Sequence, residues 1–110
     1  MAWVTPKTNW VGTDRFYAVD WKRIVGNVKY LADEMSIPYT PLDLVADGDV
    51  ITSAERNDVT EMIETIYDAV APSWDLPYIA PRTDYGSSWN SSDLNKIEKT
   101  LEDLKEEIEA

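Results

Sequence analysis

The sequence predicts an all-α fold, a three-helix bundle with long, packed, Pro-containing connectors and an internal helix-motif repeat. Three segments carry apolar residues at alternating spacings of three and four, which is the period of one helix face. Capping and helix-ending residues lie where these segments begin and end. With 110 residues the chain has the size of one domain, so we expect a single helical domain over residues 1–110.

The three expected helices cover about 18–35, 53–70 and 91 to the C-terminus. Their apolar residues follow the a and d positions of left-handed helix packing, so we expect them to form the core. In the three helices in turn, these residues are Trp21, Ile24, Val28, Leu31 and Met35; Val59, Ile63, Ile66 and Val70, widened by Met62 and Tyr67; and Leu94, Ile97, Leu101, Leu104 and Ile108.

Residues that favour helix ends support these bounds. Thr52 and Glu55 have the spacing of a capping box at the start of the second helix. Asn90 or Ser91 can cap the third helix. Prolines follow the first two helices, where they cannot donate a helical hydrogen bond: Pro38, Pro41 and Pro72.

Two connectors, roughly 36–52 and 71–90, join the expected helices. Both are longer than the usual connection of about two to eight residues between bundled helices. Their apolar content predicts that they pack on the bundle and are not disordered. The apolar residues are Tyr39, Leu42, Leu44, Val50 and Ile51 in the first connector, and Trp74, Leu76, Tyr78 and Ile79 in the second.

A helix-opening motif recurs along the chain, as expected for an internal repeat. Asp20–Ile24 aligns with Asp93–Ile97, so that an acid, an apolar residue, a base and an Ile coincide. Pro6–Trp10 resembles Pro81–Tyr85 in the segments before these helices. Any two amphipathic helices share a period, but matches at polar and loop positions favour duplication of the first and third units. For the middle helix, in which Glu55 takes the place of the acid, both explanations stay open.

Composition excludes several functional classes. The chain has no Cys and no His, which removes disulfides, thiolate metal sites and the usual general base. We therefore predict no enzyme activity, no cofactor, no metal and no small-molecule substrate. The net charge of −11 argues against nucleic acid and anionic membranes as partners. We also expect no signal peptide, and no apolar run approaches the roughly 20 residues of a membrane span.

Two acidic features need interpretation. Asp47–Gly48–Asp49 resembles a calcium loop, but Val45 and Ala54 would then fall at ligand positions, which their side chains cannot fill. We interpret this segment as a polar turn. The third helix carries carboxylates that we expect on its solvated face: Glu98, Glu102, Asp103, Glu106, Glu107 and Glu109.

The Trp residues are the predicted candidates for partner contacts. Trp21 lies on the first apolar stripe, so we expect it in the core. Trp3, Trp10, Trp74 and Trp89 lie outside the periodic positions, and an exposed Trp can stack on a sugar or fill a protein interface. The alternative is structural packing, with Trp10 and Trp89 covering the ends of the helices that follow them.

Two motifs resemble small tail- and baseplate-type structural proteins of tailed phages and prophages of Gram-positive bacteria. Asp93–Glu98, D-L-N-K-I-E, resembles the D-L-N-R-I-E helix opening of such proteins. Asp47–Thr52, D-G-D-V-I-T, is similar to their D-G-D-x-I-T-A-E segment, but departs from it by the inserted Ser53 and by Arg56 in place of Leu. The opening Trp3–Trp10 also fits the way these proteins begin.

The resemblance implies a phage- or prophage-derived structural or assembly protein that acts through contacts with other protein subunits; whether a further copy of itself is among them stays open. Such a protein resides in the bacterial cytoplasm during assembly and then in a virion or phage-like particle. Two alternatives stay open. One is a carbohydrate-binding module for a host cell surface, which would use exposed Trp residues. The other is an acidic inhibitor that mimics nucleic acid, which requires carboxylates along one exposed face.

Overall fold

A computed structural model describes residues 3–14, 16–38, 53–79 and 89–110. It contains three helices in these residues and no strand: α1 (Ala18–Glu34), α2 (Ser53–Val70) and α3 (Ser91–Glu109). Each helix contacts the other two. The predicted all-α three-helix bundle is therefore confirmed, and the expected helix bounds agree with the observed ones to within about one residue.

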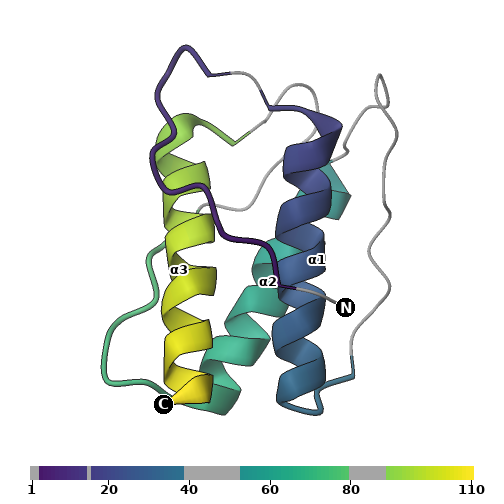
Figure 1. Cartoon of the computed structure of the whole chain (residues 1–110), viewed down its shortest axis with the longest axis vertical. Helices are drawn as coiled ribbons and strands as arrows, with labels where there is room; N and C mark the ends of the chain where they lie inside the picture. Colours follow the sequence, from purple (N-terminus) through teal and green to yellow (C-terminus); the bar gives the residue numbers. More distant parts are fainter. Residues whose placement is uncertain (1–2, 15, 39–52, 80–88) are drawn as a thin grey trace.

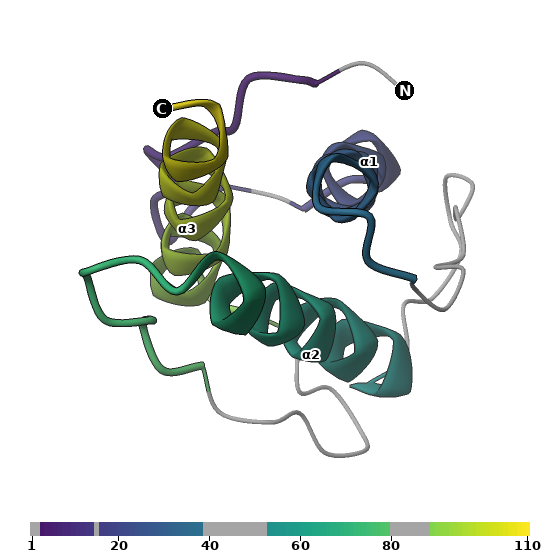
Figure 2. The ribbon, with the colours of Figure 1, turned by 90° about the horizontal axis from the view of Figure 1, so that it is seen from below.

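All three helices run in the same direction, and α2 is inclined to the other two (Figures 1 and 2). The contacts between α1 and α3 agree with this arrangement. Arg23, near the start of α1, bonds to Glu98 near the start of α3, whereas Tyr30 donates to Glu109 at the far end of α3. Because each helix begins at the end of the bundle opposite to where the previous one finishes, a short turn cannot join them. The parallel arrangement thus accounts for the length of both connectors.

The core is built from the predicted apolar stripes. Every stripe residue is buried except the one nearest each helix C-terminus and the widening residues Met62 and Tyr67, all of which are half-buried. The three C-terminal stripe residues are Met35, Val70 and Ile108. Val25 and Ala32 of α1 join the core beside the stripe. In the second connector, Trp74, Leu76 and Ile79 pack against this core.

Each helix carries an acidic residue at its third position, Asp20, Glu55 or Asp93. An Asp20 Oδ accepts the backbone N–H of Tyr17 at 2.9 Å, and an Asp93 Oδ accepts that of Asn90 at 3.2 Å. The Asn90 side chain in turn accepts the N–H of Asp93 at 2.8 Å, so Asn90, not the following serine, caps α3. The acids that align in the repeat therefore perform the same task in α1 and α3.

The first two helices end in a residue with left-handed backbone, Ser36 (φ 55°) after α1 and Ala71 (φ 51°) after α2. After α1, the N–H of Ser36 bonds to Asp33 O at 3.1 Å and the N–H of Ile37 to Ala32 O at 2.8 Å. This pair of bonds is a Schellman motif, in which glycine is the usual left-handed residue.

Replacing Ser36 or Ala71 with Gly is expected to raise the free energy of unfolding by about 0.5–1 kcal/mol in each case, because glycine adopts this backbone without a Cβ clash. Urea unfolding with an unchanged m-value measures the gain. Ser73→Gly is the matched control, since Ser73 is exposed and has no positive φ. An equal gain at Ser73 would contradict the backbone explanation.

Several sequence predictions lie outside the described residues. They concern the Asp47–Gly48–Asp49 turn, the Thr52 cap, the apolar residues of the first connector and the Pro81–Tyr85 lead-in. In the described part of the chain, no helix combines the length and apolar character needed to cross a bilayer.

Candidate functional site

All five Trp residues lie in the described part of the chain, and none is fully exposed. Trp10, Trp21 and Trp89 are buried, with exposed fractions of 4%, 0% and 7%. Trp3 and Trp74 are half-buried against the core. Their predicted role in partner contacts stays a prediction, and only Trp3 and Trp74 keep surface that a partner can reach.

The buried Trp rings form one aromatic cluster at the end of the bundle where α1 and α3 begin. Trp10 stacks on Phe16 with 5.9 Å between ring centroids, Phe16 meets the edge of Trp89 at 6.4 Å, and Trp89 stacks on Trp21 at 6.0 Å. Such pairs add about 0.5–1.5 kcal/mol each beyond simple burial. The cluster therefore joins the start of the chain to the starts of both helices.

Glu98 was expected on the solvated face of α3, and this prediction is wrong, because its side chain is completely buried. One carboxylate oxygen accepts the Nε–H of Arg23 at 2.6 Å and the backbone N–H of Lys7 at 3.1 Å. The other accepts the Nη2–H of Arg23 at 3.0 Å and the indole N–H of Trp10. The carboxylate is buried because residues far away in the sequence cover and neutralise it.

Arg23 connects Glu98 to a second carboxylate. Its Nη1 donates to Asp20 at 2.9 Å, so one guanidinium serves both acids. Burial by itself lowers the pKa of Arg23, but the hydrogen bonds and charges of Glu98 and Asp20 outweigh burial and leave this pKa raised. Because Arg23 lies between the two carboxylates, they do not face one another across an open pocket as a general acid and base would.

The buried charges anchor an extended N-terminal arm, residues 3–14, which crosses α1 and α3 (purple in Figure 1). Asn27 of α1 accepts the N–H of Val4 at 3.0 Å and donates to its carbonyl at 2.7 Å. Asn95 of α3 forms the same pair of bonds with Trp10, at 2.8 and 3.0 Å. Two amides thus bind the arm through its backbone, whatever side chains it carries.

The sequence carried a signal for two of these anchoring residues. Asn27 lies three residues after Ile24 and four before Leu31, and Glu98 lies four residues after Leu94 and three before Leu101. Both polar residues therefore occupy positions near the apolar stripes. Buried polar groups at such positions require partners, and here the arm and Arg23 provide them.

Asp14 closes a turn at the end of the arm, where its carboxylate accepts the N–H of Val11 at 3.0 Å and lies 3.3 Å from the ammonium of Lys7. The bond from Val11, and then Lys7, lower the pKa of Asp14. Its contribution to stability is therefore complete above the unfolded pKa of about 3.9 and is lost as the pH falls through the lower folded pKa.

We expect the amide chemical shift of Val11 to titrate with a midpoint below the ordinary Asp value, measured by NMR between about pH 5 and pH 2. In Asp14→Asn this titration should disappear while the helices remain folded. A midpoint at or above the ordinary value would show that the hydrogen bond from Val11 does not favour the carboxylate.

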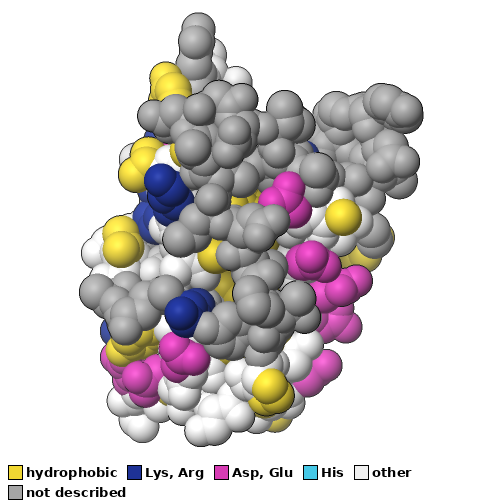
Figure 3. All heavy atoms as spheres, turned by 90° about the vertical axis from the view of Figure 1, so that its right-hand side faces the viewer, with side chains coloured by type: hydrophobic (Ala, Val, Ile, Leu, Met, Phe, Trp, Pro, Cys, Tyr) yellow, Lys and Arg dark blue, Asp and Glu magenta, His cyan; other side chains and the backbone are white. Residues whose placement is uncertain are grey.

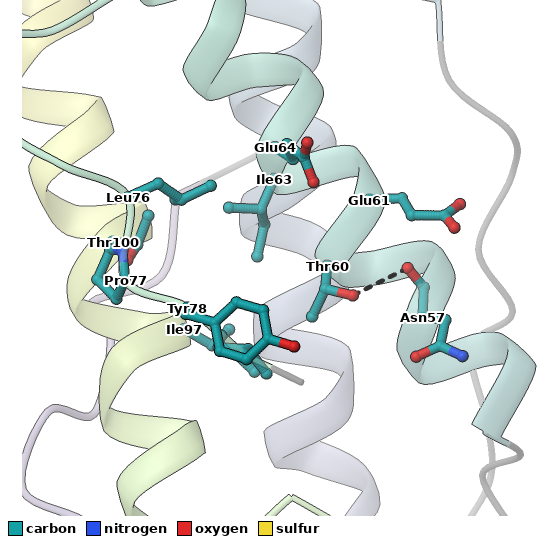
Figure 4. Close-up of a pocket in the computed structure, with 11 residues that line it drawn as sticks. Asn57, Thr60, Glu61, Ile63, Glu64, Leu76, Pro77, Tyr78, Ile97 and Thr100 are labelled. Atoms are coloured by element: carbon teal, nitrogen blue, oxygen red, sulfur yellow. Dashed lines mark hydrogen bonds between the residues drawn. The ribbon is translucent and has the colours of Figure 1, made fainter. Parts of the chain in front are cut away.

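An open groove lies on the other side of α3, between α2, the Leu76–Ile79 segment and α3 (Figure 4). We call it the α2–α3 groove; its volume is about 540 Å³. It is lined by Asn57, Thr60, Glu61, Ile63, Glu64, Leu76, Pro77, Tyr78, Ile79, Ile97 and Thr100. Ile63 and Leu76 face each other across it, and the exposed ring of Tyr78 (76% exposed) projects into its mouth. Apolar walls with a few polar groups are typical of binding pockets.

A second hollow of about 550 Å³ lies on the far side of the connector and shares Pro77 and Thr100 with the first. Its charged residues have mixed signs and are partly paired with one another. Lys99, for example, lies 3.3 Å from Glu102 and 3.0 Å from Asp103. Because charges of both signs line this hollow, it favours no particular charge in a partner.

Four acidic residues lie along one exposed face of α2. Asp58, Glu61, Glu64 and Asp68 are exposed and form no ion pair with any described residue, in contrast to the paired acids of α3. We call these four residues the α2 acidic stripe. Figure 3 shows acidic side chains gathered along the right-hand side of the face it presents, where α2 lies. The stripe borders the α2–α3 groove through Glu61 and Glu64.

In the described part of the chain, no group of three or more acidic side chains is arranged to hold a metal ion. Comparisons with protein-family models, with curated proteins and with solved structures found no match to this chain.

Proposed function

We propose that this protein is a phage- or prophage-derived structural or assembly component that acts through protein–protein contacts and not through catalysis. The observation that carries the proposal is the α2–α3 groove, an open apolar hollow of about 540 Å³ bordered by unpaired acids. The D-L-N-K-I-E opening of α3, which resembles tail and baseplate proteins, supports the phage context. On this proposal the protein is present in the bacterial cytoplasm during assembly and then in the particle.

The cluster of Arg23, Glu98 and the N-terminal arm fits a structural role. Its polar groups form hydrogen bonds with one another, so they stabilise the fold, and no acid or base in the cluster is left without a partner. An assembly subunit benefits from a rigid body of this kind because a preorganised surface loses less entropy on binding.

Particles purified after prophage induction, from a bacterium that encodes this chain, test the proposal. Mass spectrometry should find the chain in a constant ratio to the other tail proteins across gradient fractions. Its reproducible absence from intact particles, together with normal particle assembly in a deletion strain, would overturn the proposal.

The acidic inhibitor that mimics nucleic acid is the second candidate, and the α2 acidic stripe favours it. Asp58, Glu61, Glu64 and Asp68 recur every three or four residues along one exposed face. A mimic of this kind binds a nucleic-acid-binding protein with a steep dependence on salt concentration, whereas an apolar interface depends on salt only weakly. The carbohydrate-binding alternative relied on exposed Trp residues, and no Trp of this chain is fully exposed.

A further inference from the structure

We propose that the α2–α3 groove binds a basic segment of a different protein, which seats one large apolar side chain in the hollow and places Lys or Arg residues along the α2 acidic stripe. This inference rests on the proposed function, because it names the kind of partner through which an assembly protein would act. Three features of the groove support it: its size and lining, its charge, and the charge of the chain as a whole.

The groove has the dimensions and walls of a pocket for an apolar anchor. Its volume of about 540 Å³ lies within the range of about 300–1,000 Å³ that is common for ligand pockets. The half-buried Leu76, Pro77 and Ile79 provide its accessible apolar surface, and the buried side chains of Ile63 and Ile97 lie behind them. Tyr78 stands at the mouth with most of its ring in solvent, and Tyr is frequent among the residues that dominate interface energies. A side chain entering the hollow would cover the connector residues and this ring.

The negative charge at the border of the groove favours binding of a basic segment. Glu61 and Glu64 are the only charged residues among the described lining residues, and both are acidic. With Asp58 and Asp68 they extend the negative charge along α2 on either side of the hollow, and none of the four forms an ion pair with a described residue; the ammonium of Lys96 lies at the other edge of the groove, 3.4 Å from the carbonyl of Tyr78. A segment that carries Lys or Arg beside its anchor meets this stripe favourably, while an acidic segment is repelled.

The negative charge of this chain indicates that the segment bound in the α2–α3 groove belongs to another protein. A second copy of this chain also carries a net charge of −11, so two copies repel one another at long range. A basic partner is attracted instead, which raises the rate of encounter as well as the selectivity.

Fluorescence anisotropy with a labelled synthetic peptide tests the inference. The probe is a short peptide in which Lys residues flank a central Leu–Trp pair. Two further peptides of equal length serve as controls, one with Glu in place of Lys and one with Ser–Ser in place of Leu–Trp. We expect saturable binding in roughly the micromolar range for the probe, and binding at least about tenfold weaker for both controls. Equal binding of the probe and either control would overturn the inference.

Variants of the full chain place the binding in the groove. Glu61→Gln with Glu64→Gln should weaken binding of the probe about threefold to tenfold at low salt, since each exposed charge pair contributes modestly. Glu106→Gln with Glu107→Gln removes the same charge from the exposed end of α3 and should change affinity by less than about twofold. Thr60→Phe fills the hollow and should abolish binding, with circular dichroism confirming that the variant is folded.

The outcomes separate this inference from the proposed function. Equal losses in the two double variants, or full binding by Thr60→Phe, would show that the peptide binds elsewhere and would overturn the inference. The failure of every peptide to bind would overturn it as well. Detection of the chain in purified particles is independent of these results, so the structural role would stand even if the groove bound no basic segment. Self-association on the groove, detected by analytical ultracentrifugation and lost in Thr60→Phe, would assign the groove to a second copy and would also overturn the inference.

Discussion

Replacing Arg23 with Met is expected to lower the free energy of unfolding by about 3–5 kcal/mol. The side chain of Glu98 is completely buried and takes two of its four hydrogen bonds from Arg23. Without the guanidinium, a carboxylate remains in an apolar interior with no cation beside it, and the cost of its desolvation is no longer offset. Chemical denaturation monitored by Trp fluorescence measures this loss.

The converse change, Glu98→Leu, leaves Arg23 with Asp20 as partner and with 13% of its side chain exposed, but it also leaves the N–H of Lys7 and the indole N–H of Trp10 without their acceptor. The double variant, Arg23→Met with Glu98→Leu, leaves no uncompensated charge and should recover part of the stability lost in Arg23→Met, with the two unpaired N–H donors limiting the recovery. A double variant as unstable as the sum of the single variants would show that the pair contributes no coupling and that the loss arises from packing alone.

Trp10→Ala is expected to destabilise the protein by about 3–5 kcal/mol, the range for removal of a buried aromatic side chain. Trp10 is 4% exposed, stacks on Phe16 and donates its indole N–H to Glu98. Its loss also weakens the hold of the bundle on the N-terminal arm. We therefore expect trypsin to cleave after Lys7 much faster than in the unchanged protein, under conditions in which the helices remain folded.

Two variants provide the comparison for Trp10→Ala. Trp10→Phe keeps most of the packing and removes only the donor to Glu98, so it should cost about 1–3 kcal/mol. Trp3→Ala removes a half-buried ring at the other end of the arm and should cost less than Trp10→Ala. If Trp10→Ala unfolds with the stability of the unchanged protein, the arm is not part of the cooperative fold.

The sequence was sufficient to predict the helices because their signals are local. The spacing of Ile24, Val28 and Leu31 specifies a helix face without reference to the rest of the chain, and Asn90 marks a helix start by its own side chain. The same reasoning failed for Glu98. Periodicity within α3 could not reveal that Arg23 and the arm would cover one flank of the helix.

The candidate site was less accessible to prediction than the fold. The α2–α3 groove is formed by residues of α2, α3 and the connector, and it exists only once their relative placement is known. Sequence reasoning selected Trp residues because an isolated Trp is a common interface residue, yet Trp10 and Trp89 are buried and the most exposed aromatic residue near the groove is Tyr78. The parallel direction of the helices was also not predicted, although the connector lengths are consistent with it.

The bonds that anchor the arm to α3 have a consequence for the order in which the chain folds. They join residues separated by 85 to 91 positions, from Trp10–Asn95 to Lys7–Glu98. Contacts across such distances are slow to form because a long loop must close before they are gained. During synthesis, Asn95 and Glu98 emerge from the ribosome after nearly all the rest of the chain. The bonds between Asn27 and Val4 can form as soon as the arm and α1 exist, whereas the attachment of the arm to α3 has to wait for the synthesis of α3.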